Sequence, residues 1–397
     1  MRTAQTHRTF AGAALLSRGF RPFFLGAGVF ALAAVAVWPA VFGGDLQLPT
    51  AFAAVDWHAH EMLFGYGAAV VAGFLLTAIP NWTGRLPVAG GALGALAVLW
   101  LAGRCAVLVS GLIGWLPAAV IDSAFLAAFG AVVAREVAAG RNWRNVKVVG
   151  VVVLLAAANL GFHLEARFTG TASLSARAAL ALIVFLILLV GGRVVPSFTG
   201  NWLARQGDTR RPAPFDLGDA ATLALAGVAL AGWVALPDAQ AVGIGLLAAG
   251  VGALARLARW KGWRTGRDPL VLVLHVAFLL TAAGFLAAGA HAVWPLAVPA
   301  AVGLHVWAIG GIGAMTLAMM TRATLGHSGR ALSAGRGTQA IYLLIALALM
   351  ARVAMALVPG WSMPLMLLAA GAWSAGFAGF LLIYGPMLAR TRAGHGG

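Results

Sequence analysis

Residues 23–42 read FFLGAGVFALAAVAVWPAVF, an apolar run without a single charged residue. An α-helix of about 20 residues spans the hydrocarbon core of a bilayer, so this run predicts a transmembrane helix. It is too long for the apolar region of a signal peptide, and no convincing small-residue cleavage site accompanies it. The run therefore predicts a helix that stays in a membrane.

The rest of the chain has the same character. Of its 397 residues, 61% are hydrophobic, 52 are glycine and only 10% are charged. Soluble proteins carry about 25% charged residues and could not hide so much apolar surface. The runs lack two-residue alternation, which favours helices over a membrane β-barrel, and glycine lets membrane helices approach closely. We expect an all-α integral membrane protein that uses the lipid bilayer as its solvent.

Twelve apolar runs follow one another along the chain. They cover residues 23–42, 57–79, 88–109, 113–139, 146–167, 173–195, 215–236, 239–260, 269–291, 295–322, 337–358 and 362–389. The longest connections, 196–214 and 323–336, are too short to form separate domains. The sequence therefore predicts a single polytopic transmembrane domain over residues 1–397, with short cytoplasmic tails at 1–22 and 390–397.

The basic residues predict how these helices are oriented. All but four of the 27 Lys and Arg residues fall in loops on one side of the twelve-span topology, the exceptions being Arg104, Arg167, Arg177 and Arg352. Loops rich in Lys and Arg stay in the cytoplasm. We therefore expect both termini inside the cell and the protein in the bacterial cytoplasmic membrane. No basic stripe interleaved with aromatics indicates a nucleic-acid partner.

A weak internal repeat has a period of four spans. Residues 80–84 read PNWTG at the end of the second span, and residues 196–200 read PSFTG at the end of the sixth. The tenth span ends in a poorer match, MTR at 320–322. Four helices taken three times is the plan of the catalytic subunit of haem–copper oxidases, so the repeat predicts a pseudo-threefold bundle. A shared way of ending a helix is the alternative.

The most informative polar segment is DWHAHEM, residues 56–62, at the extracytoplasmic start of the second span. We expect Asp56 to cap the helix, with His58 and Glu61 on one face and His60 about 200° away. Two imidazoles and a carboxylate entering so apolar a helix are costly without partners, which predicts a metal site or the edge of a haem. The alternative is an interfacial polar cap.

His305, within the tenth span, is a further ligand candidate. It lies about 9 to 15 Å below the same surface, at a depth that fits His60 as the second axial ligand of one macrocycle. Gly310, Gly311 and Gly313 follow it and leave room for a neighbouring helix or a flat macrocycle. We therefore predict His60 and His305 as the axial pair.

Two more intramembrane histidines belong to the candidate set. His275 enters the ninth span from the opposite side, at a depth of about 10 Å, and we predict that it lines the same cavity as His305. His163 stands four residues after Asn159, so it is either a metal ligand or the hydrogen-bond partner of that amide.

Four other side chains have two interpretations each. The thioether of Met319 suits Cu(I), although methionines in helices are more often packing residues. Asp122 lies near mid-bilayer and serves either a proton relay or a hydrogen bond between helices. Arg193 and Arg322 close the sixth and tenth spans, where they either hold haem propionates or anchor the helices at the cytoplasmic surface.

Several classes of site are disfavoured by what the sequence lacks. Cys105 is the only cysteine, so there is no internal disulfide and no Cys/His array. Any metal must then be bound by histidine, methionine or oxygen. There is no Walker A motif, no GxSxG and no HExxH, which argues against hydrolase and nucleotide-driven functions.

With these residues described, the sequence resembles the NnrS family of haem- and copper-containing bacterial membrane proteins associated with the nitric oxide response. The resemblance is carried by residues 19–24 (GFRPFF), 57–65 (WHAHEMLFG), 73–84 (GFLLTAIPNWTG), 191–196 (GGRVVP) with Thr199, and 313–330, which contain MMTR at 319–322 and LGH at 325–327. The last two spans carry little of it. It implies haem b, less firmly copper, nitric oxide as a ligand, an unidentified electron donor and protection against nitrosative stress.

The resemblance leaves open whether the protein is an enzyme. A haem with an open coordination position would bind nitric oxide, whereas a bis-histidine haem would point to electron transfer. A secondary transporter is the main alternative, because twelve helices with both termini inside is also a transporter plan. A helper of metal insertion without its own cofactor is a third hypothesis.

Overall fold

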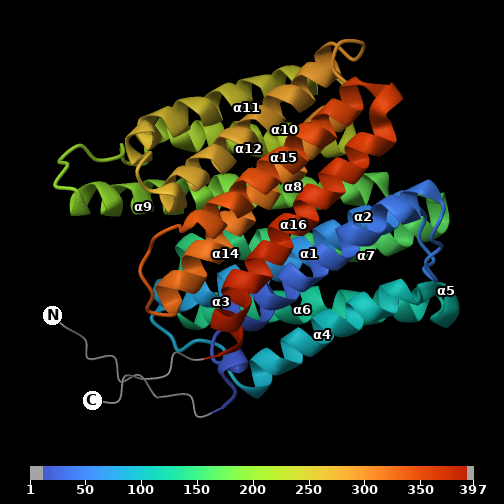
Figure 1. Ribbon diagram of the computed structural model, residues 1–397, viewed down its shortest axis with the longest axis horizontal. Coiled ribbons are helices and arrows are strands. Elements are labelled where there is room, and N and C mark those ends of the chain that lie inside the picture. Colours follow the sequence, from blue (N-terminus) through green and yellow to red (C-terminus); the bar gives the residue numbers. More distant parts are fainter. Residues whose placement is uncertain (1–11, 391–397) are drawn as a thin grey trace.

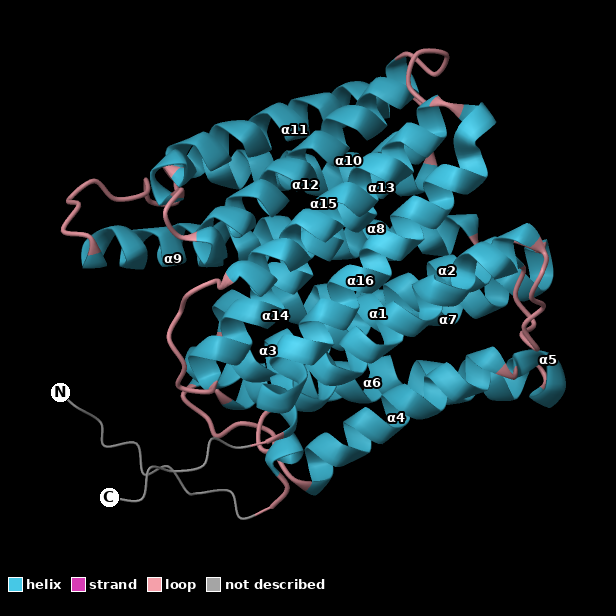
Figure 2. Ribbon diagram, viewed as in Figure 1, coloured by secondary structure: helices cyan, strands magenta, loops and turns pink. Residues whose placement is uncertain are grey.

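The computed structural model describes residues 12–390, and within that range every regular element is a helix (Figure 2). Twelve of the helical stretches are long and apolar enough to cross a membrane, which confirms the predicted all-α polytopic fold. They run side by side in one bundle (Figure 1). Helices suit this solvent because they bond nearly all of their own N–H and C=O groups, which lipid cannot do.

Most spans are single α-helices. Their bounds are α1 (Phe20–Gly43), α4 (Gly91–Leu108), α6 (Trp115–Ala139), α7 (Val146–Thr169), α10 (Leu217–Ala235), α11 (Gln240–Arg259), α12 (Pro269–Val293), α15 (Arg336–Leu357) and α16 (Ser362–Ala389). A one-turn helix, α5 (Ser110–Ile113), joins α4 to α6. Short 3₁₀ turns at Ala14–Leu16, Trp143–Asn145, Gly262–Thr265 and Pro359–Trp361 precede α1, α7, α12 and α16.

The second, sixth and tenth spans each contain a π-helical segment between two α-helices. The pairs are α2 (Ala54–His60) and α3 (Ala68–Thr83) around Glu61–Gly67, α8 (Ser173–Leu186) and α9 (Gly192–Arg205) around Ile187–Gly191, and α13 (Ala300–His305) and α14 (Ala314–His327) around Val306–Gly313. π-Helical turns are rare and occur frequently at functional sites. Their recurrence at every fourth span has the period of the sequence repeat, while the pseudo-threefold bundle itself stays a prediction.

These three interrupted spans meet in the interior. The second and sixth are the most buried of the twelve, because 72% and 67% of the 18-residue apolar stretch of each lies buried inside the protein. Tyr66 of the second span and Thr316 of the tenth join their hydroxyls at 2.5 Å. A Cβ added to Gly67 would lie 3.1 Å from Ile183 of the sixth span, so the second and sixth also pack closely. The middle of the protein is therefore formed by the spans that carry the candidate ligands.

The sixth and tenth spans extend furthest beyond their predicted ends. The sixth span continues to Arg205 and the tenth to His327, so the first parts of both predicted connections are helical. Pro196 lies inside α9 one turn after the π-helical segment, and Gly200 does not end that helix. By contrast, Gly84 adopts a φ of 70° and ends α3. The helix-ending explanation of the repeat therefore applies only to residues 80–84.

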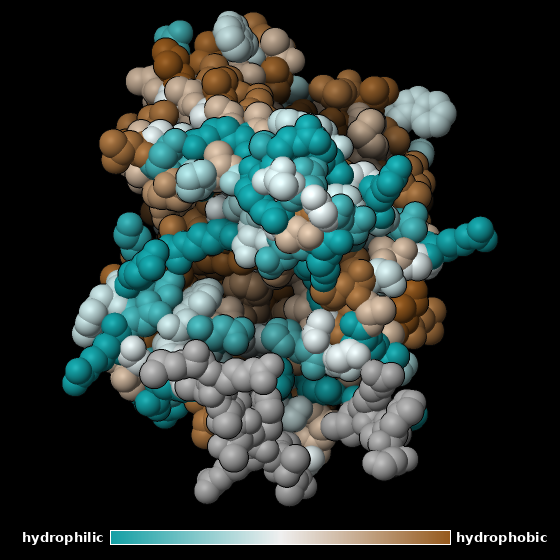
Figure 3. Space-filling model, turned by 90° about the vertical axis from the view of Figure 1, so that its left-hand side faces the viewer, coloured by the Kyte–Doolittle hydropathy of each residue, from teal (hydrophilic) through white to brown (hydrophobic). Residues whose placement is uncertain are grey.

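The two ends of the described chain lie at the same end of the bundle (Figure 1). Arg21 of α1 ties them together, because its Nη1 donates to the carbonyls of Met387, Leu388 and Arg390 at 2.9 to 3.1 Å. Figure 3 shows hydrophilic side chains gathered on this face, with hydrophobic side chains at its margins. The assignment of this end to the cytoplasm stays a prediction. The predicted tails lie largely outside the described residues.

Candidate functional site

His58 and His60, two residues apart on α2, enter different parts of the interior. α2 already begins two residues before Asp56, so this aspartate does not cap the helix as predicted. Instead, Asp56 Oδ1 accepts a hydrogen bond from the backbone N–H of Ala172 at 3.4 Å. Residues i and i+2 of an α-helix point about 200° apart. The two imidazoles therefore belong to two separate sites.

The first of these, the His58 site, consists of His58, Trp38, His305 and Arg352. The ring of His58 stacks on Trp38 of α1, with centroids 4.2 Å apart and planes 18° apart. His305 and Arg352 lie close enough for their charges to act on His58. His58 Nδ1 is buried and has no hydrogen-bond partner among the described residues. Two imidazoles and one guanidinium thus lie within range of one another's charges at the His58 end of the second and tenth spans.

The hydrogen bond of His305 determines which of its nitrogens can bind a metal. Its Nδ1 lies 2.8 Å from the carbonyl oxygen of Ala301, so Nδ1 carries the proton and donates. The lone pair then resides on Nε2, which is how a metal-binding histidine is usually held. His305 is therefore arranged as a ligand would be.

The structure changes the predicted partner of His305. We predicted His60 from its depth, but His60 faces away, and His58 is the imidazole beside His305. Depth was a poor guide here because two residues along a helix change depth by only about 3 Å while reversing the face.

The glycines after His305 serve helix packing. A Cβ on Gly311 would lie 3.0 Å from Thr281 Oγ1, and one on Gly313 would lie 2.7 Å from the ring of Trp373. Gly310 packs in the same way against Leu280. We predicted that these glycines leave room for a neighbouring helix or for a flat macrocycle, and their contacts are with neighbouring helices.

The second site, the His60 network, consists of His60, Glu61, Arg104, Asp122, Asn159 and His163. His60 is completely buried, and its Nδ1 lies 3.0 Å from Glu61 Oε1. Its Nε2 lies 3.0 Å from Asn159 Oδ1 and 3.2 Å from Asp122 Oδ2. Glu61 was expected on the face of His58. In the structure its carboxylate reaches His60 instead, at the residue where the π-helical segment begins.

His163 of α7 and Asp122 of α6 complete the donor set. His163 Nε2 lies 2.9 Å from Asp122 Oδ2, and the ring centroids of His60 and His163 are 5.1 Å apart. Asn159 donates to the same carboxylate oxygen at 2.9 Å. His163 was predicted as a ligand or as the hydrogen-bond partner of Asn159; in the structure both side chains bond to Asp122 instead, and the ligand role stays a prediction.

Arg104 of α4 links the two carboxylates. Its Nη1 donates to Glu61 Oε1 at 2.7 Å, and its Nη2 donates to Asp122 Oδ1. With both imidazoles neutral, one guanidinium and two carboxylates leave one negative charge in the membrane interior. An uncompensated charge there is expensive. The network therefore requires a further positive charge, which a proton on an imidazole, a proton on a carboxylate or a metal cation would supply.

The residues present fit a transition metal. One donor atom from each of His60, Asp122 and His163 lies within 4.8 Å of the others, and all three residues are buried. Two imidazoles and a carboxylate suit copper, zinc or iron. Glu61 Oε2 is buried without a hydrogen-bond partner among the described residues, so one more oxygen is free nearby.

His275 does not lie near His305, and the predicted shared cavity is wrong. Gly303 packs against Ala288, and Gly284 packs against Trp307. His305 therefore lies level with the part of α12 midway between Gly284 and Ala288. At 1.5 Å per residue, His275 is about 16 Å further along α12. There it shares a hydrogen bond of 2.8 Å with Thr199. The two histidines enter from opposite ends of neighbouring antiparallel helices.

Three other candidates also lie at the far end of the bundle. Met319 is about 21 Å along the helix from His305 and packs against the core. Arg322, about 25 Å from His305, places its guanidinium 4.2 Å from the ring centroid of Phe198. Arg193 donates to Asn145 Oδ1 at 2.8 Å. These positions separate all three from both histidine sites.

Sequence reasoning missed Arg104 and Arg352 as site residues. Both were counted only as exceptions to the charge asymmetry of the loops. Their position in the sequence could have identified them, because an arginine that lies within an apolar span and away from the basic side needs a partner inside the protein.

The comparisons with known proteins agree with the resemblance in the sequence. The family model described as NnrS protein matches residues 14–392 of the 397-residue chain. No curated protein and no solved structure matches the chain.

Proposed function

The chain belongs to the NnrS family, and from this premise we propose that it is a membrane metalloprotein of the nitric oxide response. It binds or turns over nitric oxide in a bacterial inner membrane and so protects the cell against nitrosative stress. One observation carries the proposal: α2 directs His58 and His60 to opposite sides, where His60 contacts the ring of His163 and His58 lies within range of the charge of His305.

The His58 site is the proposed haem b site, with His58 and His305 as the ligands. Two features support it: the buried, unpartnered Nδ1 of His58, and the Nδ1 of His305 that is already committed to Ala301. Arg352 is the cation suited to a propionate. A haem held there would supply electron transfer while both histidines stay bound, and it would bind nitric oxide once one of them gives up its coordination position. Trp38 holds the ring of His58 in one plane.

The His60 network is the proposed second metal site, with copper as the metal that the family implies. His60, His163 and Asp122 are its ligands, and Arg104 and Glu61 orient them. A bound cation would neutralise the excess negative charge of the network. Without a metal, a proton on His60 would have the same effect, so His60 and Asp122 are also the residues placed to hold and pass a proton.

A secondary transporter is the second candidate function. The observation that favours it is the buried ion pair of Arg104 with Glu61 and Asp122, because carboxylates inside membrane spans are typical of proton-coupled carriers. Twelve spans are also a common transporter plan. Both candidates use the same network, but only the first requires a coloured cofactor.

Optical spectroscopy and metal analysis of the purified full-length protein separate the two functions. We expect a Soret band that sharpens and shifts when dithionite reduces the protein and shifts again when nitric oxide is added. We also expect copper in stoichiometric amounts. A colourless, metal-free preparation from cells supplied with haem and copper would contradict the proposal and favour a transporter.

A further inference from the structure

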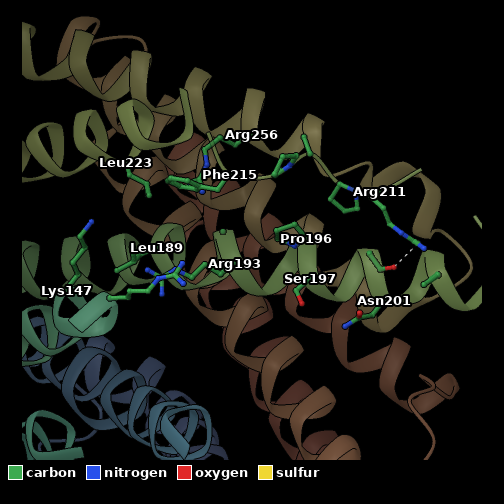
Figure 4. Close-up of a pocket in the computed structure, with 17 residues that line it drawn as sticks. Lys147, Leu189, Arg193, Pro196, Ser197, Asn201, Arg211, Phe215, Leu223 and Arg256 are labelled. Atoms are coloured by element: carbon green, nitrogen blue, oxygen red, sulfur yellow. Dashed lines mark hydrogen bonds between the residues drawn. The ribbon is translucent and has the colours of Figure 1, made fainter. Parts of the chain in front are cut away.

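A large basic pocket lies at the end of the bundle where the described chain ends lie, away from both histidine sites. Its volume is about 670 Å³, and it is bordered by the start of α7, by α9, by the loop that follows α9 and by α10 and α11 (Figure 4). No histidine lines it. It is therefore a site separate from those proposed for haem and metal.

The lining of this pocket carries an excess of positive charge. Five cations line it and no carboxylate does: Arg144, Lys147, Arg193, Arg211 and Arg256. Arg144 and Arg193 are close enough for their charges to repel. Asp219, behind the wall, pairs with Arg256 at 3.1 Å and offsets only one of the charges. Such a concentration of cations favours an anion in the pocket.

Arg256 provides an unused hydrogen-bond donor in the wall. Only 3% of this residue is exposed, and its Nε donates to Asp219. Its Nη1 is buried and has no partner among the described residues, although a buried donor normally has one. Gly192 faces the guanidinium, because a Cβ there would lie 2.5 Å from Arg256 Nη2. The absence of a side chain at Gly192 leaves room for the guanidinium beside the pocket.

The margin of the pocket is apolar and exposed, as lipid contact requires. Phe215, which lines the pocket, is 60% exposed, and Leu217 two residues later is 88% exposed. On the other side, Trp143 and Val146 adjoin the lining cations in sequence and are 65% and 50% exposed. A free anion would gain nothing from these side chains, whereas acyl chains would cover them.

We propose that this pocket binds the phosphate headgroup of an anionic phospholipid, whose acyl chains lie over the exposed apolar margin. Guanidinium groups suit phosphate oxygens because their paired N–H groups match the geometry of the anion. Basic pockets between membrane helices at the cytoplasmic side are typical sites for such headgroups. The proposal does not depend on the function proposed for the histidine sites.

The test uses the full-length protein in neutral detergent and measures its thermal unfolding midpoint against added phosphatidylglycerol. Phosphatidylcholine and inorganic phosphate form parallel arms. The pocket variant is Arg144→Gln with Lys147→Gln, two exposed residues at the start of the fifth span. The control is Arg330→Gln with Arg336→Gln, which removes the same charge from two exposed positions, one in a loop and one at the start of α15, at the same end of the bundle. Each protein is compared with its own lipid-free midpoint.

We expect phosphatidylglycerol to raise the midpoint of the wild-type protein and of the control at similar concentrations. If each of the two pocket cations contributes about 1 kcal/mol of attraction to the headgroup, or about fivefold in affinity, the pocket variant should need about twenty-five-fold more lipid. Equal weakening in both variants would overturn the pocket as the site. A rise produced by inorganic phosphate alone, or equally by phosphatidylcholine, would overturn the lipid as its ligand.

Discussion

His58 and His60 stand two residues apart on α2, yet their rings contact different neighbours. His58 stacks on Trp38, with centroids 4.2 Å apart, while His60 lies 3.0 Å from both Glu61 Oε1 and Asn159 Oδ1. One turn of one helix therefore supplies a histidine to each of two sites.

Arg104→Met should destabilise the protein strongly. The substitution leaves Glu61 and Asp122 buried without their shared cation, and breaking a buried ion pair from one side costs about 3 to 5 kcal/mol. Arg135→Met is the control, because Arg135 is exposed where it pairs with Glu136, and such surface pairs contribute about 0 to 1 kcal/mol. Thermal or denaturant unfolding in detergent measures both. Equal losses in the two variants would contradict the role of Arg104.

Gly303→Ala should loosen the packing of the tenth span on the ninth. The new Cβ would meet the backbone of Ala288 at 2.6 Å, and backbone cannot move aside as a side chain can. Overpacking of this kind costs about 1 to 3 kcal/mol. Gly371→Ala is the matched control, because its Cβ would meet nothing within 4 Å on the exposed side of α16. Unfolding midpoints should fall only for the first variant.

Lipid binding in the basic pocket should not change between pH 8 and pH 5. The loop beside it is held by two aspartates. Hydrogen bonds from the backbone and guanidinium of Arg210 lower the pKa of Asp208, and the guanidinium of Arg259 lowers the pKa of Asp216. Because both folded-state pKa values are lowered, the stability that these aspartates give is present above the unfolded pKa, about 3.9, and is lost only as the pH falls through the folded pKa. Both aspartates therefore stay ionised between pH 8 and pH 5, and the loop keeps its structure.

The lipid-dependent unfolding midpoint at a series of pH values checks this expectation. Asp208→Asn serves as the comparison, because it removes the partner of Arg264 at every pH. A lipid effect that declines between pH 8 and pH 5 would show that another group controls the loop.

The end of the bundle that contains α9 should face the cytoplasm. Cysteines placed at Arg141 and Arg330 should resist a membrane-impermeant maleimide in spheroplasts, whereas one at Leu296, fully exposed at the opposite end, should react. Cys105 is exposed and must first be replaced by alanine. Labelling of the two loop positions with protection of Leu296 would invert the orientation.

The number of spans was predictable from the sequence because hydropathy and helix length determine it directly. The partners of the histidines were not. They depend on which neighbouring helices pack against each side of α2, and this packing does not change the hydropathy of the run. Arg104 was missed because the bond that defines its role links α4 to α2 and α6, which sequence spacing does not reveal.

The depths of His275 and His305 show a second limit. Each depth was estimated from its own helix end, and errors of a turn at both ends add. The structure removes them because Gly303 fixes the register of the tenth span against Ala288. Relative height in a bundle is therefore set by small-residue contacts between helices.

The central claim is that His58 and His305, and not His60, hold a haem. The most direct test is the haem content of purified His58→Ala and His60→Asn variants, measured from the Soret absorbance per folded protein after size-exclusion chromatography. We predict that His58→Ala loses the band, while His60→Asn keeps it and loses only the second metal. A haem-free His60→Asn variant beside a His58→Ala variant with full haem content would contradict the account.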